Sequence, residues 1–80
     1  MGMPYFTITL GGNDGRVVGQ AVGLRDAVTL ARQWFRRMRS MSQSGRVLPV
    51  EVRRVVRLRG MRYDTEWLMC TVTEQGVSGI

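Results

Sequence analysis

The sequence predicts an α+β domain with the element order ββαββ, in which an antiparallel sheet carries one long helix packed across one face. Two short segments of β character surround a Gly-rich turn near the start of the chain. A single segment free of Gly and Pro follows at 24–41, and two further β-rich segments come after it. The 80 residues suffice for one domain only, which we assign to residues 1–80.

The first two elements are expected to form a hairpin. Residues 4–10 alternate apolar and polar side chains, a pattern typical of a half-buried strand. Residues 11–15 are rich in Gly, Asn and Asp, which favour turns. Residues 16–22 can then return as the second strand.

The segment 24–41 is the expected helix. Gly23 is acceptable as its N-cap, and Asp26 places a negative charge near the positive end of the helix dipole. At 100° per residue, one apolar stripe contains Leu24, Ala27, Val28, Ala31, Trp34, Phe35 and Met38. We expect this stripe to pack on the sheet.

A second hairpin is expected from residues 49–58 and 63–73, joined by a type II′ turn at Gly60. The register that sorts apolar from charged side chains places Trp67 on the inner face, opposite Arg54, and assigns Cys70 to the outer face. The same register pairs Arg57 with Asp64 on the outer face. Residues from 76 onward are expected to fray.

Positive charge is concentrated in the middle of the chain. All twelve basic residues are Arg, against six acidic residues, which gives a formal net charge of +6. Residues 25–62 hold eleven of these Arg and two acids, whereas the remainder of the chain is slightly acidic. Such a concentration attracts anions. Codon usage and selection for the bidentate guanidinium group both explain the exclusive use of Arg, and the choice stays open.

The candidate binding residues fall into two groups. The acid of the helix, Asp26, points away from its Arg stripe. The charge of that stripe is therefore balanced by acids of the final strand, by solvent or by an anionic partner; a solvated basic face is the alternative interpretation. The helix group comprises Arg25, Arg32, Arg36 and Arg39, and the outer face of the second hairpin contributes Arg53, Arg57, Arg59 and Arg62.

The composition excludes several classes of chemistry. Without His, catalysis by an imidazole base is impossible, and one Cys permits no internal disulfide. Cys70 is the only soft ligand, which disfavours a zinc site. The carboxylates are scattered, so we expect no enzyme, no metal and no cofactor.

No apolar run approaches a membrane span, and no secretory signal pattern is present, which favours the cytoplasm. Met41 and Met61 near the turns weakly favour a protein partner, because Met suits adaptable binding surfaces.

A short basic chain with one Arg-lined helix (24–41) between two hairpins (6–22 and 50–72) resembles the small inhibitors that phages and mobile elements encode, type I anti-CRISPR proteins in particular. The resemblance covers the whole chain as size and architecture, and it shares no motif and assigns no residue a role. It implies a non-enzymatic inhibitor in the cytoplasm of a bacterial host that occupies an acidic protein surface or a nucleoprotein complex such as a Cas effector. Many such inhibitors are acidic DNA mimics, from which a charge of +6 departs.

Two other functional classes stay open. One is a stand-alone nucleic-acid-binding module that contacts the DNA or RNA backbone without reading bases. The other is a structural or assembly subunit that buries these surfaces in an oligomer. The sequence determines neither the partner nor the oligomeric state.

Overall fold

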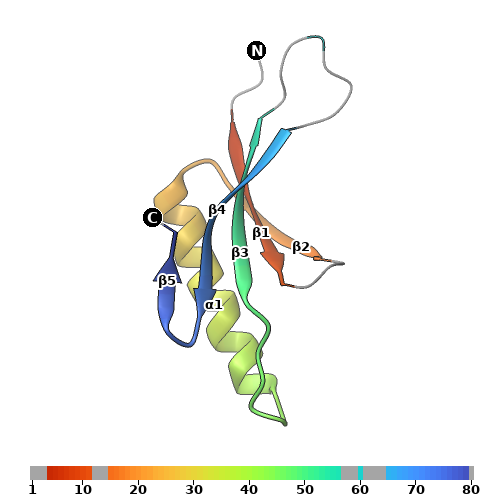
Figure 1. The fold of residues 1–80 in the computed structure, drawn as a ribbon, viewed down its shortest axis with the longest axis vertical. Helices are drawn as coiled ribbons and strands as arrows, with labels where there is room; N and C mark the ends of the chain where they lie inside the picture. Colours follow the sequence, from red (N-terminus) through yellow and green to blue (C-terminus); the bar gives the residue numbers. More distant parts are fainter. Residues whose placement is uncertain (1–3, 12–14, 57–59, 61–64, 80) are drawn as a thin grey trace.

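In the part of the chain that the structure describes, one antiparallel sheet carries one helix across one face (Figure 1). The computed structural model describes residues 4–11, 15–56, 60 and 65–79. The strand order in the sheet is β2-β1-β3-β4-β5. The elements are β1 (Tyr5–Leu10), β2 (Val17–Ala21), α1 (Leu24–Met41), β3 (Val50–Val56), β4 (Thr65–Thr73) and β5 (Gly76–Ser78).

The predicted order ββαββ is wrong because the chain adds a fifth strand. The segment from Gly76, expected to fray, turns back and pairs with the end of β4, where Thr73 lies opposite Gly76. Gly76 has a φ of +105°, a conformation that favours Gly in a tight turn. Val77 packs against the core, which adds a hydrophobic contact to this three-residue strand.

The first hairpin and the helix agree with the sequence predictions. β1 and β2 pair in antiparallel fashion, with one irregularity between Ile8 and Thr9. α1 has the predicted bounds, Gly23 is its N-cap, and Asp26 lies in its first turn. The backbone N–H of Ala27 donates to the carbonyl oxygen of Gly23, at a donor–acceptor distance of 3.0 Å.

The core lies between α1 and the sheet. The apolar stripe of the helix supplies Ala27, Ala31 and Phe35, all buried, and Trp34 packs against them partly buried. Small side chains at two of these positions let the helix approach the strands closely. The buried core residues of the strands are Ile8, Val50, Val52, Cys70 and Val72.

A bulge changes the register of the second hairpin part-way along. Beyond the bulge, Arg54 lies opposite Trp67 as predicted. Between Val52 and Arg53 the pairing shifts, so that Val52 lies opposite Cys70. The prediction that Cys70 faces outward is therefore wrong: one extra residue in β4 turns the thiol toward the helix, where it is buried.

The far part of the β3–β4 hairpin projects beyond α1 (Figure 1). Trp67, predicted as a core residue, is 47% exposed, because the helix does not cover that part of the face. Its partner Arg54 is also exposed. The cation–π contact in the described part of the chain is a different one, with the guanidinium of Arg37 5.5 Å from the ring centre of Trp34.

Part of the predicted hairpin lies outside the described residues. This applies to the pair Arg57–Asp64 and to the flanks of the expected type II′ turn. Gly60 itself is described and has a φ of +85°.

Candidate functional site

Three of the four Arg residues predicted on the helix line one groove. We call it the arginine groove; it runs between α1 and the β4–β5 hairpin and has a volume of about 330 Å³. Spacings of four and three residues along a helix place side chains on neighbouring parts of one face. The residues that define the groove are Arg32, Phe35, Arg36, Arg39, Glu74 and Val77.

The arginine groove combines a cationic rim with an apolar floor. Arg32, Arg36 and Arg39 are exposed, whereas Phe35 beneath them is buried and belongs to the core. Val77 of β5 is half-buried beside it. A ligand in this groove therefore meets guanidinium groups and apolar surface together.

Only one of these Arg side chains has an acidic neighbour in the described part of the chain. The Nε of Arg39 lies 4.0 Å from Oε1 of Glu74, and both side chains are more than half exposed. An exposed pair at this distance contributes at most about 1 kcal/mol. No ion pair within the described residues involves Arg32 or Arg36. An acid near the final strand thus offsets the helix charge only in part.

Sequence reasoning did not foresee how Glu74 comes to the groove. Glu74 lies in the turn between β4 and β5, and the return of the chain into β5 carries it to the last turn of α1. The available signal was the Gly at position 76 two residues after it, followed by an apolar residue.

The structure does not unite all eight predicted binding residues. Arg25 is exposed in the first turn of α1, outside the arginine groove. Arg53 projects from the sheet face opposite the helix, because it alternates with the buried Val52. Its Nη2 donates to Oε2 of Glu51 at 3.1 Å, so its charge is paired. The last three predicted residues, Arg57, Arg59 and Arg62, lie outside the described residues.

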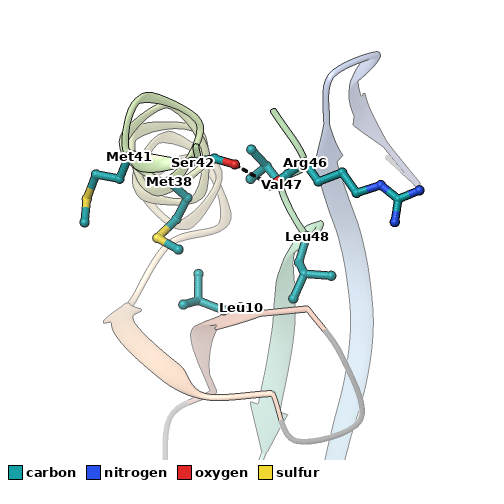
Figure 2. A pocket seen from close by; sticks show the side chains of 7 residues that line it. All are labelled: Leu10, Met38, Met41, Ser42, Arg46, Val47 and Leu48. Atoms are coloured by element: carbon teal, nitrogen blue, oxygen red, sulfur yellow. Dashed lines mark hydrogen bonds between the residues drawn. The ribbon is translucent and has the colours of Figure 1, made fainter. Parts of the chain in front are cut away.

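A second groove, which we call the apolar groove, lies where α1 ends (Figure 2). Its volume is about 360 Å³, and its lining comprises Leu10, Met38, Met41, Arg46, Val47 and Leu48, together with Ser42. Met41 is 69% exposed and Leu48 is 65% exposed, so two large apolar side chains border it in solvent. The Ser42 hydroxyl donates to the carbonyl oxygen of Arg46 at 2.8 Å and is therefore satisfied.

Sequence analysis missed the apolar groove because its walls come from three separate segments. Of the residues that line it, the sequence singles out Met41, which together with Met61 lies near a predicted turn and suits an adaptable binding surface. The groove exists because Leu10 at the end of β1 and Leu48 before β3 are brought beside the last turn of α1 (Figure 2). No local sequence pattern predicts that these three segments pack side by side.

The described residues hold no group of three His, Cys, Asp or Glu side chains that could bind a metal ion. Burial raises the pKa of the Cys70 thiol, which favours the unreactive protonated form. In the described part of the chain, no helix is long and apolar enough to cross a bilayer.

Comparisons with protein-family models, with curated proteins and with solved structures gave no match.

Proposed function

We propose that this protein is a non-enzymatic binding protein that docks the arginine groove on an acidic protein surface of a nucleoprotein complex. One observation carries the proposal. Arg32, Arg36 and Arg39 share a single groove with an apolar floor, and one weakly paired carboxylate, that of Glu74, faces them.

The mixture of apolar and guanidinium groups favours a protein over a nucleic acid backbone. Arg and aromatic residues are enriched in the buried parts of protein interfaces, where bidentate pairing with carboxylates adds specificity. A phosphate backbone, in contrast, requires a continuous cationic track. Glu74 interrupts such a track at Arg39, and Arg53 does not extend it because it lies on the opposite face of the sheet.

The class of partner follows from the resemblance to phage and mobile-element inhibitors. In this proposal the protein acts in the cytoplasm of a bacterial host, and type I Cas effector complexes are the first partners to test. The fifth strand alters the architecture on which that resemblance was drawn, while the small size and the single Arg-lined helix are unchanged.

The test compares two triple variants of equal charge by biolayer interferometry against purified type I effector complexes. The groove variant changes Arg32, Arg36 and Arg39 to Gln. The matched control changes three exposed Arg residues outside the groove, Arg16, Arg37 and Arg54, to Gln. Each variant removes three positive charges from a formal net charge of +6, leaving +3. We expect the groove variant to lose at least about tenfold in affinity and the control to change far less, because contact pairs act locally.

Equal losses of affinity in the two variants would show that the interaction is unspecific charge attraction, and would overturn the docking proposal.

Fluorescence anisotropy with labelled duplex DNA, single-stranded DNA and RNA forms the second arm of the test. Binding near physiological salt with a steep salt dependence would favour a nucleic-acid-binding module instead. Sedimentation equilibrium forms the third arm, in which a concentration-dependent mass would favour an assembly subunit.

A further inference from the structure

The apolar groove at the end of α1 is large enough to receive a large apolar side chain, and its lining is mostly apolar. Its volume of about 360 Å³ lies at the lower end of the range for ligand pockets. Met38, Leu10, Val47 and Leu48 lie around its hollow, and Met41 borders it with a side chain directed away from Leu48 (Figure 2). The flexible thioether side chains of Met adapt to differently shaped apolar groups.

The polar surroundings of the groove are cationic. Arg46 is exposed at its border, and no carboxylate among the described residues forms an ion pair with it. The hydroxyl of Ser42 is already occupied by the carbonyl oxygen of Arg46. A ligand therefore gains apolar contact inside the groove and charge pairing at its border.

A depression between the apolar groove and the arginine groove shares lining residues with each of them. Arg46 and Val47 line both the apolar groove and a shallow depression that continues over Gly45 to Glu74. Glu74 in turn borders the arginine groove. One extended partner segment could therefore contact both sites.

We infer that the apolar groove is an anchor site for a large apolar side chain, such as Leu, within an acidic segment of a protein partner. The side chain lies between Met38 and Leu48, and carboxylates beside it in the partner pair with Arg46. Charge complementarity selects this occupant, since the chain carries +6 and Arg46 borders the groove without forming an ion pair among the described residues. This inference depends on the proposed function for the class of partner.

The test uses a synthetic peptide of Asp and Glu around a central Leu, with a matched peptide that has Ala at the centre and another in which Gln replaces the acids. The protein is labelled with ¹³C at its Met methyl groups, and Met38 and Met41 are assigned by single Met→Leu variants. We expect the Leu peptide to shift the Met38 and Met41 methyl signals. The Ala and Gln peptides should each bind at least about tenfold more weakly, because each lacks one of the two kinds of contact.

A matched pair of protein variants localises the site. Leu48→Ser removes an exposed apolar side chain at the groove and should weaken binding of the Leu peptide at least about tenfold. Val22→Ser removes a side chain that is 73% exposed elsewhere and should leave the affinity unchanged. Equal affinity for the Leu and Ala peptides, or equal effects of the two variants, would overturn the inference. Methyl shifts that appear on concentrating the protein alone, with a dimer mass, would also overturn it and make a second copy the occupant.

The two proposals can fail separately. Suppose that the triple variant (Arg32→Gln, Arg36→Gln and Arg39→Gln) no longer docks on the effector, while Leu48→Ser leaves binding of the Leu peptide unchanged. The proposed function is then supported and the anchor site is refuted. If that triple variant docks normally while binding of the Leu peptide still requires Leu48, the proposed function is refuted and the anchor site is supported.

Discussion

The two ends of the β3–β4 hairpin have similar β-rich sequences but differ in burial. At the end beneath α1, Val52 and Cys70 lie opposite each other and are both buried. At the projecting end, Arg54 and Trp67 lie opposite each other and are both exposed. An alternating strand pattern therefore predicts which face a residue occupies, whereas the reach of the helix decides whether that face is covered.

The largest expected contrast is between two aromatic truncations. Phe35→Ala removes a side chain that is 6% exposed in the core beneath the arginine groove, and should lower the free energy of unfolding by about 3–5 kcal/mol. Trp67→Ala removes a larger but half-exposed side chain at the projecting end and should cost about 1 kcal/mol. Urea unfolding followed by circular dichroism measures both. Similar losses would mean that the projecting end is covered in solution.

A backbone contact at the covered end should give the next largest effect. Gly11 donates its N–H to the carbonyl oxygen of Pro49 at 2.6 Å, and a Cβ at this position would collide with the same oxygen. Gly11→Ala should therefore destabilise the protein by about 1–3 kcal/mol through forced backbone displacement. Gly60→Ala at the far end of the hairpin is the comparison, since a Cβ there meets open space but its φ of +85° is unfavourable for Ala. Thermal unfolding of both variants measures which substitution lowers the melting temperature more, and we expect Gly11→Ala to lower it more. A Gly11→Ala variant as stable as the wild type would contradict the close approach of Gly11 to Pro49.

The thiol of Cys70 predicts a pH dependence at the covered end. Burial raises the pKa of Cys70, so the folded protein holds the thiol proton more tightly than the unfolded chain does. The corresponding stability is fully present below the ordinary thiol pKa and is lost as the pH rises through the raised value. The free energy of unfolding of the wild type should therefore fall more steeply at alkaline pH than that of Cys70→Ala, which lacks the titrating group. Parallel pH profiles in urea unfolding would show that the thiol does not contribute.

The smallest stability effect is expected at the exposed acids. Glu74→Gln breaks the 4.0 Å pair with Arg39 and should change the free energy of unfolding by less than about 0.5 kcal/mol. It should nevertheless strengthen docking on an acidic partner severalfold, because a repelling charge leaves the arginine groove. Glu66→Gln makes the same charge change at the projecting end and should affect affinity less. If interferometry shows a larger gain in affinity for Glu66→Gln than for Glu74→Gln, the docking surface lies on the projecting end of the hairpin.

Local patterns predicted the first hairpin and the helix well. The strands β1 and β2 and the full extent of α1 follow from alternation, from the Gly-rich turn and from a helical apolar stripe. The register of Arg54 with Trp67 was also correct. These features depend on residues close in sequence or on one clear sorting of polar from apolar side chains.

The errors arose where contacts between distant residues decide the outcome. The bulge beside Val52 reverses the face of Cys70, although the alternation of β4 gives no sign of it. β5 has three residues, too few for a periodic pattern, and forms because Val77 gains a place against the core. Of the predicted binding residues, Arg32, Arg36 and Arg39 come together because they lie close in sequence on one face of α1, whereas Arg53 is separated from them by the thickness of the sheet.

The sequence by itself determined the helix from Leu24 to Met41, its apolar stripe and the Arg side chains beside that stripe. Helical periodicity is a local property, since side chains three and four residues apart share a face in any environment. Only the tertiary structure decided that Glu74 meets Arg39 and that Leu10, Met38 and Leu48 enclose a groove. These contacts join residues far apart in the chain, and the distances between those residues depend on strand pairing and on where the helix ends.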